Sequence, residues 1–358
     1  MGYSSRKNCK PPLTFWLVKA IYKIGGEKLM MRCQWWVHSW FAERAANYLS
    51  GSEVIHGWSQ WSEPSLEWAK TRGIPTVLER SSAHIIEQSR LLAEEHQRVG
   101  SRWAATHPKI EQMELREYEL CSSVAIPSLF VERSFKQQAF PSEKLFRNSL
   151  GVNLNCFKAP ITAPKAPSAI GLKVIYAGSL SVRKGISDLL EGFAEADLRN
   201  AKLTLVGGET EELKALLEKQ PKTVERKGHI AQNALVEHYQ RSHCFVMNSI
   251  EEGMAMVQMQ ALACGVPLIC STNTGGEDLL KLSGDKGRTV REGITQFPAG
   301  FLIPIHSPTA ISWCLRKLAI EDSLWKTMRD ESLKLANNKL SWADYGRRAI
   351  KHYKGLMQ

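Results

Sequence analysis

The chain has 358 residues, of which 43% are hydrophobic and 23% charged, and it carries a formal net charge of +11. This length suits two domains better than one core, and the composition excludes an intrinsically disordered chain. No apolar run reaches the roughly 18 residues of a membrane-spanning helix, and residues 1–32 lack the unbroken apolar stretch and cleavage site of a signal peptide.

Eight cysteines are scattered between Cys9 and Cys314, and no two of them form a C-x-x-C pair. This spacing argues against a zinc site and against a disulfide framework. It predicts a cytoplasmic location, because thiols are kept reduced in that compartment.

The first tenth of the chain carries more than half of the excess positive charge. Residues 1–32 hold seven basic residues and one acid, a net charge of +6, interleaved with aromatic and apolar side chains. This pattern favours a helix lying on an anionic membrane surface, peripheral to the inner membrane face. A solvated basic helix that covers the core fits it equally well. No nucleic-acid-binding motif accompanies the charge, so no nucleic-acid partner is expected.

Residues 1–157 predict a small α/β domain. Apolar runs indicate strands at Val54–His56, Thr76–Leu78 and Val124–Ile126. Helical periodicity is found at Leu66–Arg72, Ile85–Arg98, Ile110–Leu120 and Phe130–Gln138. No strand with a glycine-rich loop is evident before Val54, so this domain is expected to be abbreviated, without its opening βα units.

Residues 158–170, rich in proline and alanine, predict an extended, semi-rigid linker. Residues 171–340 predict a second domain. Residues 341–358 predict a C-terminal helix, periodic over Trp342–Tyr353, that packs back on the first domain.

The second domain alternates strands with helices, joined by short glycine-bearing turns. Strands are predicted at Lys173–Ala177, Lys202–Val206, Thr223–Arg226, Cys244–Met247, Pro267–Cys270 and Gly300–Ile303. Helices are predicted at Ile186–Ala194, Glu211–Lys219, Asn233–Gln240 and Ala255–Ala263. This order indicates a parallel, doubly wound sheet, whose ligands bind at the carboxyl ends of the strands.

The segment Glu251–Gly265 is the strongest candidate for a ligand site. A strand ends, two acids and Gly253 follow, and a helix begins whose first amides have no partner within the helix. Gly253 lets a ligand approach the backbone, which makes the start of this helix an anion site. The carboxylate of Glu252 suits sugar hydroxyls, and Gln260 lies roughly 12 Å further along the helix. A capped helix with an apolar core face is the alternative, and it holds for the methionines.

The loop after the first strand of this domain is GSLSVRKG, from Gly178 to Gly185. Adjacent Arg183 and Lys184 near a helix start suit the diphosphate of a leaving group, because fixed cations stabilise its developing charge. A surface Arg-Lys pair is the alternative. Two further pieces, Gly228–His229–Ile230 and Thr274–Glu277, follow other strands, and each also fits a simple turn.

Together these pieces resemble the donor domain of the retaining family 4 glycosyltransferases, which have the GT-B fold. The match runs from about residue 172 to 310 through GSLSVRKG, LVGG, GHI, EEGMAMVQMQALACGVPLI and NTGGEDL. Residues 1–157 resemble the acceptor side of a bacterial, polysaccharide-type branch of that family through VIHGWSQWS, AKTRGIPTVLERSSAHI and VAIPSLFVERSF.

The resemblance implies an α/β protein with two Rossmann-like domains facing across a cleft. It implies metal-independent transfer, with retained anomeric configuration, from a UDP- or GDP-linked sugar to a growing polysaccharide or a lipid-linked saccharide. No metal and no cofactor are expected beyond the nucleotide sugar. A degenerate GT-B module that binds nucleotide sugar or a partner without catalysis is the alternative, and a GT-B sugar-nucleotide epimerase fits the motifs less well.

By this resemblance, Glu252 contacts the transferred sugar, and His84 contacts it near the anomeric centre. The predicted donor-binding residues are Gly178, Arg183, Lys184, Gly228, His229, Ile230, Gly253, Met254, Ala255, Met256 and Gln260. Position 260 departs from the family pattern, which has a glutamate there to bind the ribose hydroxyls. For His84, a helix-capping role is the alternative.

Overall fold

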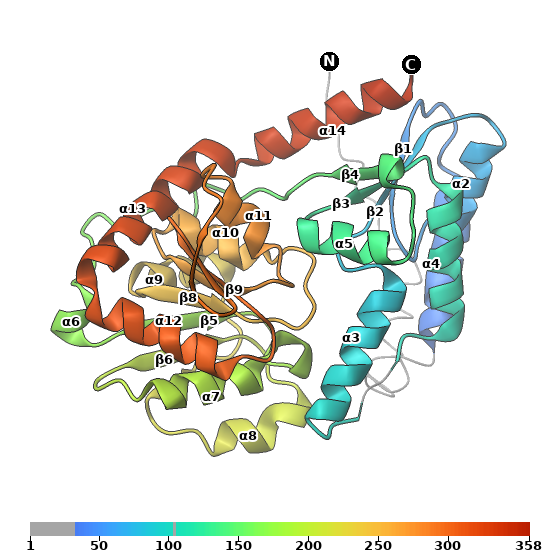
Figure 1. Ribbon diagram of the computed structural model, residues 1–358. Coiled ribbons are helices and arrows are strands. Elements are labelled where there is room, and N and C mark those ends of the chain that lie inside the picture. The colour runs from blue at the N-terminus through green and yellow to red at the C-terminus, as the bar shows by residue number, and fades with distance from the viewer. Residues whose placement is uncertain (1–32, 103–104) are drawn as a thin grey trace. The chain divides into compact units, whose positions relative to one another are not determined.

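The computed structural model describes residues 33–102 and 105–358 (Figure 1). The predicted membrane-surface segment, residues 1–32, lies outside the described residues. Within the described part, no helix is long and apolar enough to cross a membrane. Backbone contacts divide the described residues into two compact units: residues 33–79 with 105–124, and residues 80–102 with 125–356.

The first unit is a small α/β unit. Residues 33–46 are helical, and the named elements are β1 (Ile55–Trp58), α2 (Glu63–Lys70), β2 (Thr76–Glu79) and α4 (Pro108–Leu120). Strand β1 pairs in parallel with β2, and α2 packs against α4. The strands predicted around residues 54–56 and 76–78 and the helix predicted at 110–120 are therefore confirmed. The missing opening βα units stay a prediction.

A buried carboxylate shapes the loop that follows β1. Glu117, in α4, accepts hydrogen bonds from the backbone N–H groups of Gln60, Ser62 and Glu63 at 2.6, 2.7 and 3.1 Å. Burial raises the pKa of Glu117 to about 7, against the lowering effect of those amides. The loop is therefore closed by one side chain from a distant helix.

The second unit is built on an eight-stranded sheet with the order β10-β11-β12-β9-β8-β5-β6-β7. Its strands are β5 (Lys173–Ala177), β6 (Lys202–Val206), β7 (Val224–Arg226), β8 (Cys244–Met247), β9 (Leu268–Ser271), β10 (Arg288–Arg291), β11 (Ile294–Phe297) and β12 (Gly300–Ile303). Within this order, the adjacent strands β12-β9-β8-β5-β6-β7 are parallel to one another. Strands β5, β6, β8 and β12 have the predicted bounds. The parallel sheet is therefore confirmed for the predicted strands, and β10 and β11, which were not predicted, add an antiparallel edge to it.

Helices cover this sheet, as Figure 1 shows. They are α7 (Ile186–Ala196), α8 (Lys214–Glu218), α9 (Gln232–Gln240), α10 (Met256–Ala263), α11 (Gly276–Lys281), α12 (Pro308–Ile320) and α13 (Asp322–Lys339). Helix α7 packs against α12, and α10 packs against α13. The buried apolar residues of strands and helices form one continuous core.

The remaining elements of the second unit come from both halves of the sequence. They are α3 (Ile85–Arg98), α5 (Leu129–Gln137), β4 (Leu145–Arg147), α6 (Pro167–Ile170) and α14 (Trp342–Leu356), while β3 (Ser123–Ile126) crosses the boundary between the units. Within the predicted linker, residues 158–166 have no helix or strand, but Pro167–Ile170 forms a helical turn that an extended linker did not predict. Proline favours the first position of a helix because its fixed φ is helical.

The predicted C-terminal helix is confirmed as α14 (Figure 1). Its Arg348 donates to the side chain of Asn148 at 2.8 Å and to the carbonyl of Ser149 at 2.6 Å. Its His352 stacks on Phe146 with ring centroids 3.9 Å apart. Helix α14 is thus fastened to the segment that precedes the linker.

Candidate donor-binding site

The site is assembled from the loops that leave β5 and β8, two adjacent parallel strands. After β5, a short 3-10 turn, η2 (Val182–Lys184), presents Arg183 and Lys184. The carbonyl of Arg183 accepts a hydrogen bond from the backbone N–H of Ile250 at 2.9 Å. The side-chain amide of Asn248 donates to the carbonyl of Gly185 at 2.7 Å. These bonds hold the two cations beside the two acids that follow Ile250.

Gly185 makes this junction possible for two separate reasons. Its φ is +66°, a left-handed conformation that favours glycine, and a Cβ atom would lie 2.5 Å from the carbonyl oxygen of Asn248. The RKG sequence therefore combines the charged pair with the one residue type that lets the loops meet.

Four charged side chains form a connected cluster at this junction. Arg183 donates to Glu251 at 2.8 Å and to Glu252 at 3.2 Å, and Lys184 forms an ion pair with Glu252. The motifs predict that the cations bind a diphosphate and that Glu252 binds a sugar. In the described structure both cations contact Glu252, and the ligand contacts stay predictions.

Lys184 is buried, and its charge is correspondingly sensitive to its surroundings. Burial, with Arg183 adding to the effect and Glu251 opposing it, lowers the pKa of Lys184 to about 7. An anion that reaches Lys184 therefore favours the protonated ammonium form.

Glu251 was not singled out from the sequence, although it turns out to organise the cluster. It is 0% exposed. Besides Arg183, its carboxylate accepts hydrogen bonds from the backbone N–H of Ala83 at 2.9 Å and from the side chain of Gln88 at 3.1 Å. Gln88 in turn accepts a hydrogen bond from Arg80 at 2.7 Å. Residues 80–88 are thus hydrogen-bonded to the loop that follows β8, which we call the donor loop.

Gly253 permits a close approach, but by the protein's own backbone. A Cβ atom at this position would lie 1.7 Å from the carbonyl oxygen of Ser81. The hydroxyl of Ser128 donates to the carbonyl of Gly253 at 2.6 Å. The need for glycine at position 253 is therefore explained by the Ser81 segment.

Helix α10 begins directly after this loop. Ala255 is its N-terminal cap and offers no side-chain hydrogen bond. Met254 and Ala255 are buried, whereas Met256 is exposed at the start of the helix, so the core face predicted for the methionines holds for Met259 and was wrong for Met256. The first turn is therefore uncapped, as the sequence predicted, and anion binding there stays a prediction.

Gln260 lies on the same helix with little solvent access. It is 6% exposed, and its side-chain oxygen accepts a hydrogen bond from the hydroxyl of the buried Tyr239 at 3.3 Å. The ribose contact predicted for position 260 stays a prediction, since the Tyr239 bond uses the carbonyl end of the amide.

His84 is the N-terminal cap of α3, and its Nδ1 accepts a hydrogen bond from the N–H of Ile86 at 3.4 Å. The ring is buried and meets the edge of Phe135 with centroids 4.9 Å apart. Burial, with Arg80 adding to it, lowers the pKa of His84 to about 4, so the imidazole is neutral at physiological pH. This geometry is the helix-capping alternative, and it leaves the sugar contact a prediction.

The predicted glycines lie at the ends of neighbouring strands. The backbone N–H of Gly207, after β6, donates to the carbonyl of Gly228, after β7, at 2.8 Å. A Cβ atom on Gly207 would lie 1.8 Å from the carbonyl of Gly178, after β5. His229 is exposed and Ile230 half-buried beside this row. The strand ends thus present backbone groups at one edge of the sheet.

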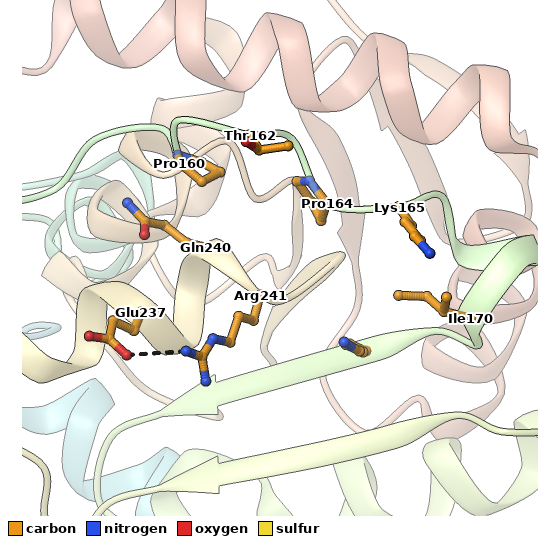
Figure 2. Close-up of a pocket in the computed structure, with 9 residues that line it drawn as sticks. Pro160, Thr162, Pro164, Lys165, Ile170, Glu237, Gln240 and Arg241 are labelled. Atoms are coloured by element: carbon orange, nitrogen blue, oxygen red, sulfur yellow. Dashed lines mark hydrogen bonds and ion pairs between the residues drawn. The ribbon is translucent and has the colours of Figure 1, made fainter.

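A separate pocket of about 520 Å³ opens at the start of β5 (Figure 2). It is lined by Pro160, Thr162, Pro164, Lys165, Ile170, Lys173, Glu237, Gln240 and Arg241. Lys173 is the first residue of β5, whereas the loop with Arg183 and Lys184 follows its last residue. This pocket therefore lies at the opposite end of the strand from the predicted donor-binding residues. In the described ranges, no group of three or more His, Cys, Asp or Glu side chains could hold a metal ion.

Comparison with known proteins defines the class of this fold. Residues 171–319 match the family model described as "Glycosyl transferases group 1". Among solved structures, sucrose-phosphate synthase from Thermosynechococcus elongatus aligns with a TM-score of 0.67 and 19% identity, covering 90% of this chain and 78% of that one. The fold is therefore GT-B, an α/β architecture of two Rossmann-like domains.

Two further proteins are similar to this chain. The HepE protein of Anabaena, solved in complex with UDP, aligns with a TM-score of 0.65 and 14% identity, covering 88% of this chain and 82% of that one. A curated relative is the UDP-N-acetylglucosamine–peptide N-acetylglucosaminyltransferase GtfA subunit of Streptococcus parasanguinis, 29% identical over 165 residues. That match covers 44% of this chain and spans 31% of the relative's length.

Proposed function

We propose that this protein is a retaining glycosyltransferase that moves a sugar from a UDP- or GDP-linked donor to a saccharide or lipid-linked saccharide acceptor, without a metal ion. The observation that carries the proposal is the cluster of Arg183, Lys184 and Glu252 at the carboxyl ends of β5 and β8. The group 1 glycosyltransferase match over residues 171–319, together with the UDP complex of HepE, supports it.

The chemistry needs positioning and charge stabilisation rather than a protein nucleophile. Arg183 and Lys184 hold the diphosphate, so the negative charge that develops on the leaving group meets two fixed cations. Glu252 accepts hydrogen bonds from the sugar hydroxyls. As the bond between sugar and phosphate breaks, positive charge develops at the anomeric carbon. The acceptor hydroxyl attacks from the same face and gives its proton to the departing diphosphate, which retains the anomeric configuration.

The acceptor side of the proposal rests on residues 1–157. We place a growing polysaccharide or glycolipid there, at the cytoplasmic face of the inner membrane, with residues 1–32 on the anionic surface.

A screen of UDP-, GDP- and ADP-sugars tests the donor proposal. At least one sugar nucleotide is expected to raise the melting temperature and to be hydrolysed slowly. Glu252→Ala is expected to lose most turnover, because the transferred sugar loses its carboxylate contact. Arg183→Ala combined with Lys184→Ala is expected to weaken nucleoside diphosphate binding, by tenfold or more for each charge-assisted contact of about 1.4 kcal/mol. The absence of both stabilisation and hydrolysis across the screen would refute the donor site.

The alternative is a degenerate GT-B module that binds nucleotide sugar or a partner without transfer. The capping geometry of His84 and the buried amide of Gln260 favour it. A sugar nucleotide that stabilises the protein, with no hydrolysis and no transfer to any acceptor, would support this alternative.

A further inference from the structure

The two adjacent acids of the donor loop are held in different ways. The carboxylate of Glu251 is 0% exposed and takes hydrogen bonds from three donors, the N–H of Ala83 and the side chains of Gln88 and Arg183. These donors come from two separate segments of the chain. Glu251 is thus fixed on several sides.

Glu252 has fewer constraints. Its side chain is 16% exposed, and in the described part of the chain Arg183 and Lys184 both contact one of its oxygens, Oε2. These are the two cations assigned to the donor diphosphate. The carboxylate predicted to bind the sugar is therefore paired with the cations predicted to bind the phosphates.

The charge balance shows why this pairing must change when a donor arrives. With Lys184 protonated, two cations and two carboxylates balance in the structure as it stands. A nucleoside diphosphate sugar brings two more negative charges, one on each phosphate. If Glu252 kept its place, four negative charges would face two positive ones in a partly buried site, where like charges repel strongly. Glu251 cannot move away from Arg183 in its place, because its buried carboxylate would lose its hydrogen-bond donors.

We propose that Glu252 is a displaceable counter-ion, which the donor diphosphate replaces on Arg183 and Lys184, and that Glu251 is the positioning residue that keeps Arg183 in place during the exchange. This inference rests on the proposed donor site. The displaced carboxylate is then free to accept hydrogen bonds from the sugar. Sugar recognition becomes available only after the diphosphate has bound, which discriminates against free sugars.

Two isosteric substitutions with the same change in charge test the proposal. Glu252→Gln and Glu251→Gln each remove one negative charge from neighbouring positions. Calorimetric titration with UDP, which lacks the transferred sugar that Glu252 would contact, is expected to show about tenfold tighter binding to Glu252→Gln than to the wild type, because the competing anion is gone. Glu251→Gln is expected to bind UDP about tenfold more weakly, because Arg183 loses its anchor.

Opposite shifts separate this exchange from simpler explanations. A general electrostatic effect would tighten both variants, and a general structural effect would weaken both. Binding of uridine, which has no phosphate, should be unchanged in Glu251→Gln, whereas damage to the fold would weaken it as well. If Glu251→Gln fails to fold, Gln88→Met, which removes one hydrogen bond from Glu251, is expected to weaken UDP binding in the same direction.

Unchanged or weaker UDP binding by Glu252→Gln would overturn the exchange. If Glu252→Gln gives that result but the wild type binds UDP and hydrolyses a sugar nucleotide, the proposed function stands and only the counter-ion exchange is refuted. If the wild type binds none of the UDP, GDP and ADP series, the donor site itself is refuted, and the exchange fails with it.

Discussion

His243 makes the acid stability of the second unit testable at a single residue. Its ring is fully buried. Nδ1 accepts a hydrogen bond from the backbone N–H of Lys173 at 2.9 Å, and Nε2 lies 2.9 Å from the carbonyl oxygen of Lys165. A carbonyl can only accept, so Nε2 carries the proton and Nδ1 is bare. Protonation of Nδ1 would set two N–H groups against each other.

The size of the effect follows from the pKa. Burial, opposed by the hydrogen bond to Lys165, lowers the pKa of His243 from 6.5 to about 4 in the folded protein. Between these values the unfolded chain binds a proton that the folded chain does not, so stability is lost as pH falls through this window. From about pH 7.5 to about pH 5, the linkage relation gives a loss of about 2 kcal/mol from this group.

The variant His243→Gln isolates this contribution, because glutamine does not titrate. Urea unfolding is measured for the wild type and the variant at both pH values. Glu117 and Asp278, whose pKa values burial raises, contribute with the opposite sign, and they cancel in the comparison. The wild-type advantage in free energy of unfolding is expected to shrink by about 2 kcal/mol at the lower pH. An advantage that does not depend on pH, or an imidazole that titrates near 6.5 by NMR, would refute the reasoning.

Two further outcomes follow from the donor loop and the N-terminus. Gly253→Ala should lower the free energy of unfolding by about 1–3 kcal/mol in urea titration, because its Cβ would lie 1.7 Å from the carbonyl of Ser81, and an unchanged midpoint would contradict that contact. Removal of residues 1–32 should abolish co-sedimentation with vesicles containing anionic lipid while leaving UDP binding unchanged; retained sedimentation would contradict the membrane-surface segment.

The strands of the second unit could be predicted because each is a short apolar run closed by glycine or a polar turn. Strands β5 and β6 have their predicted bounds for this reason. Strand β10 could not be predicted, since Arg288–Arg291 has only Thr289 and Val290 between two arginines, lies largely exposed and has no apolar run. Helices α12 and α13 were also not predicted from the sequence.

The residues of the candidate site also differ in whether the sequence indicates them. Arg183, Lys184 and Glu252 were predicted because each lies next to a strand end and carries its chemistry in its side chain. The anchoring role of Glu251 depends on Ala83 and Gln88, which lie 168 and 163 residues earlier in the chain. Periodicity and motif spacing report local order, so a contact over that separation leaves no signal in them.

Gln260 is where the family pattern and this chain differ, and one comparison of ligands separates its two roles. The bond from Tyr239 uses the carbonyl end of the Gln260 amide, so the amide nitrogen is the group that can serve a ribose hydroxyl. We expect the wild type to bind UDP more tightly than 2′,3′-dideoxy-UDP by roughly 2–10-fold, the effect of one neutral hydrogen bond of about 0.5–1.5 kcal/mol.

Gln260→Ala should bring that ratio close to one, whereas Tyr239→Phe, which removes only the hydroxyl that orients the amide, should reduce it in part. If Gln260→Ala lowers stability and leaves the ratio unchanged, position 260 belongs to the core of α10. The glutamate of the family pattern would then have no counterpart in this site, and nucleotide recognition would rest on the diphosphate cations and the backbone groups at the strand ends.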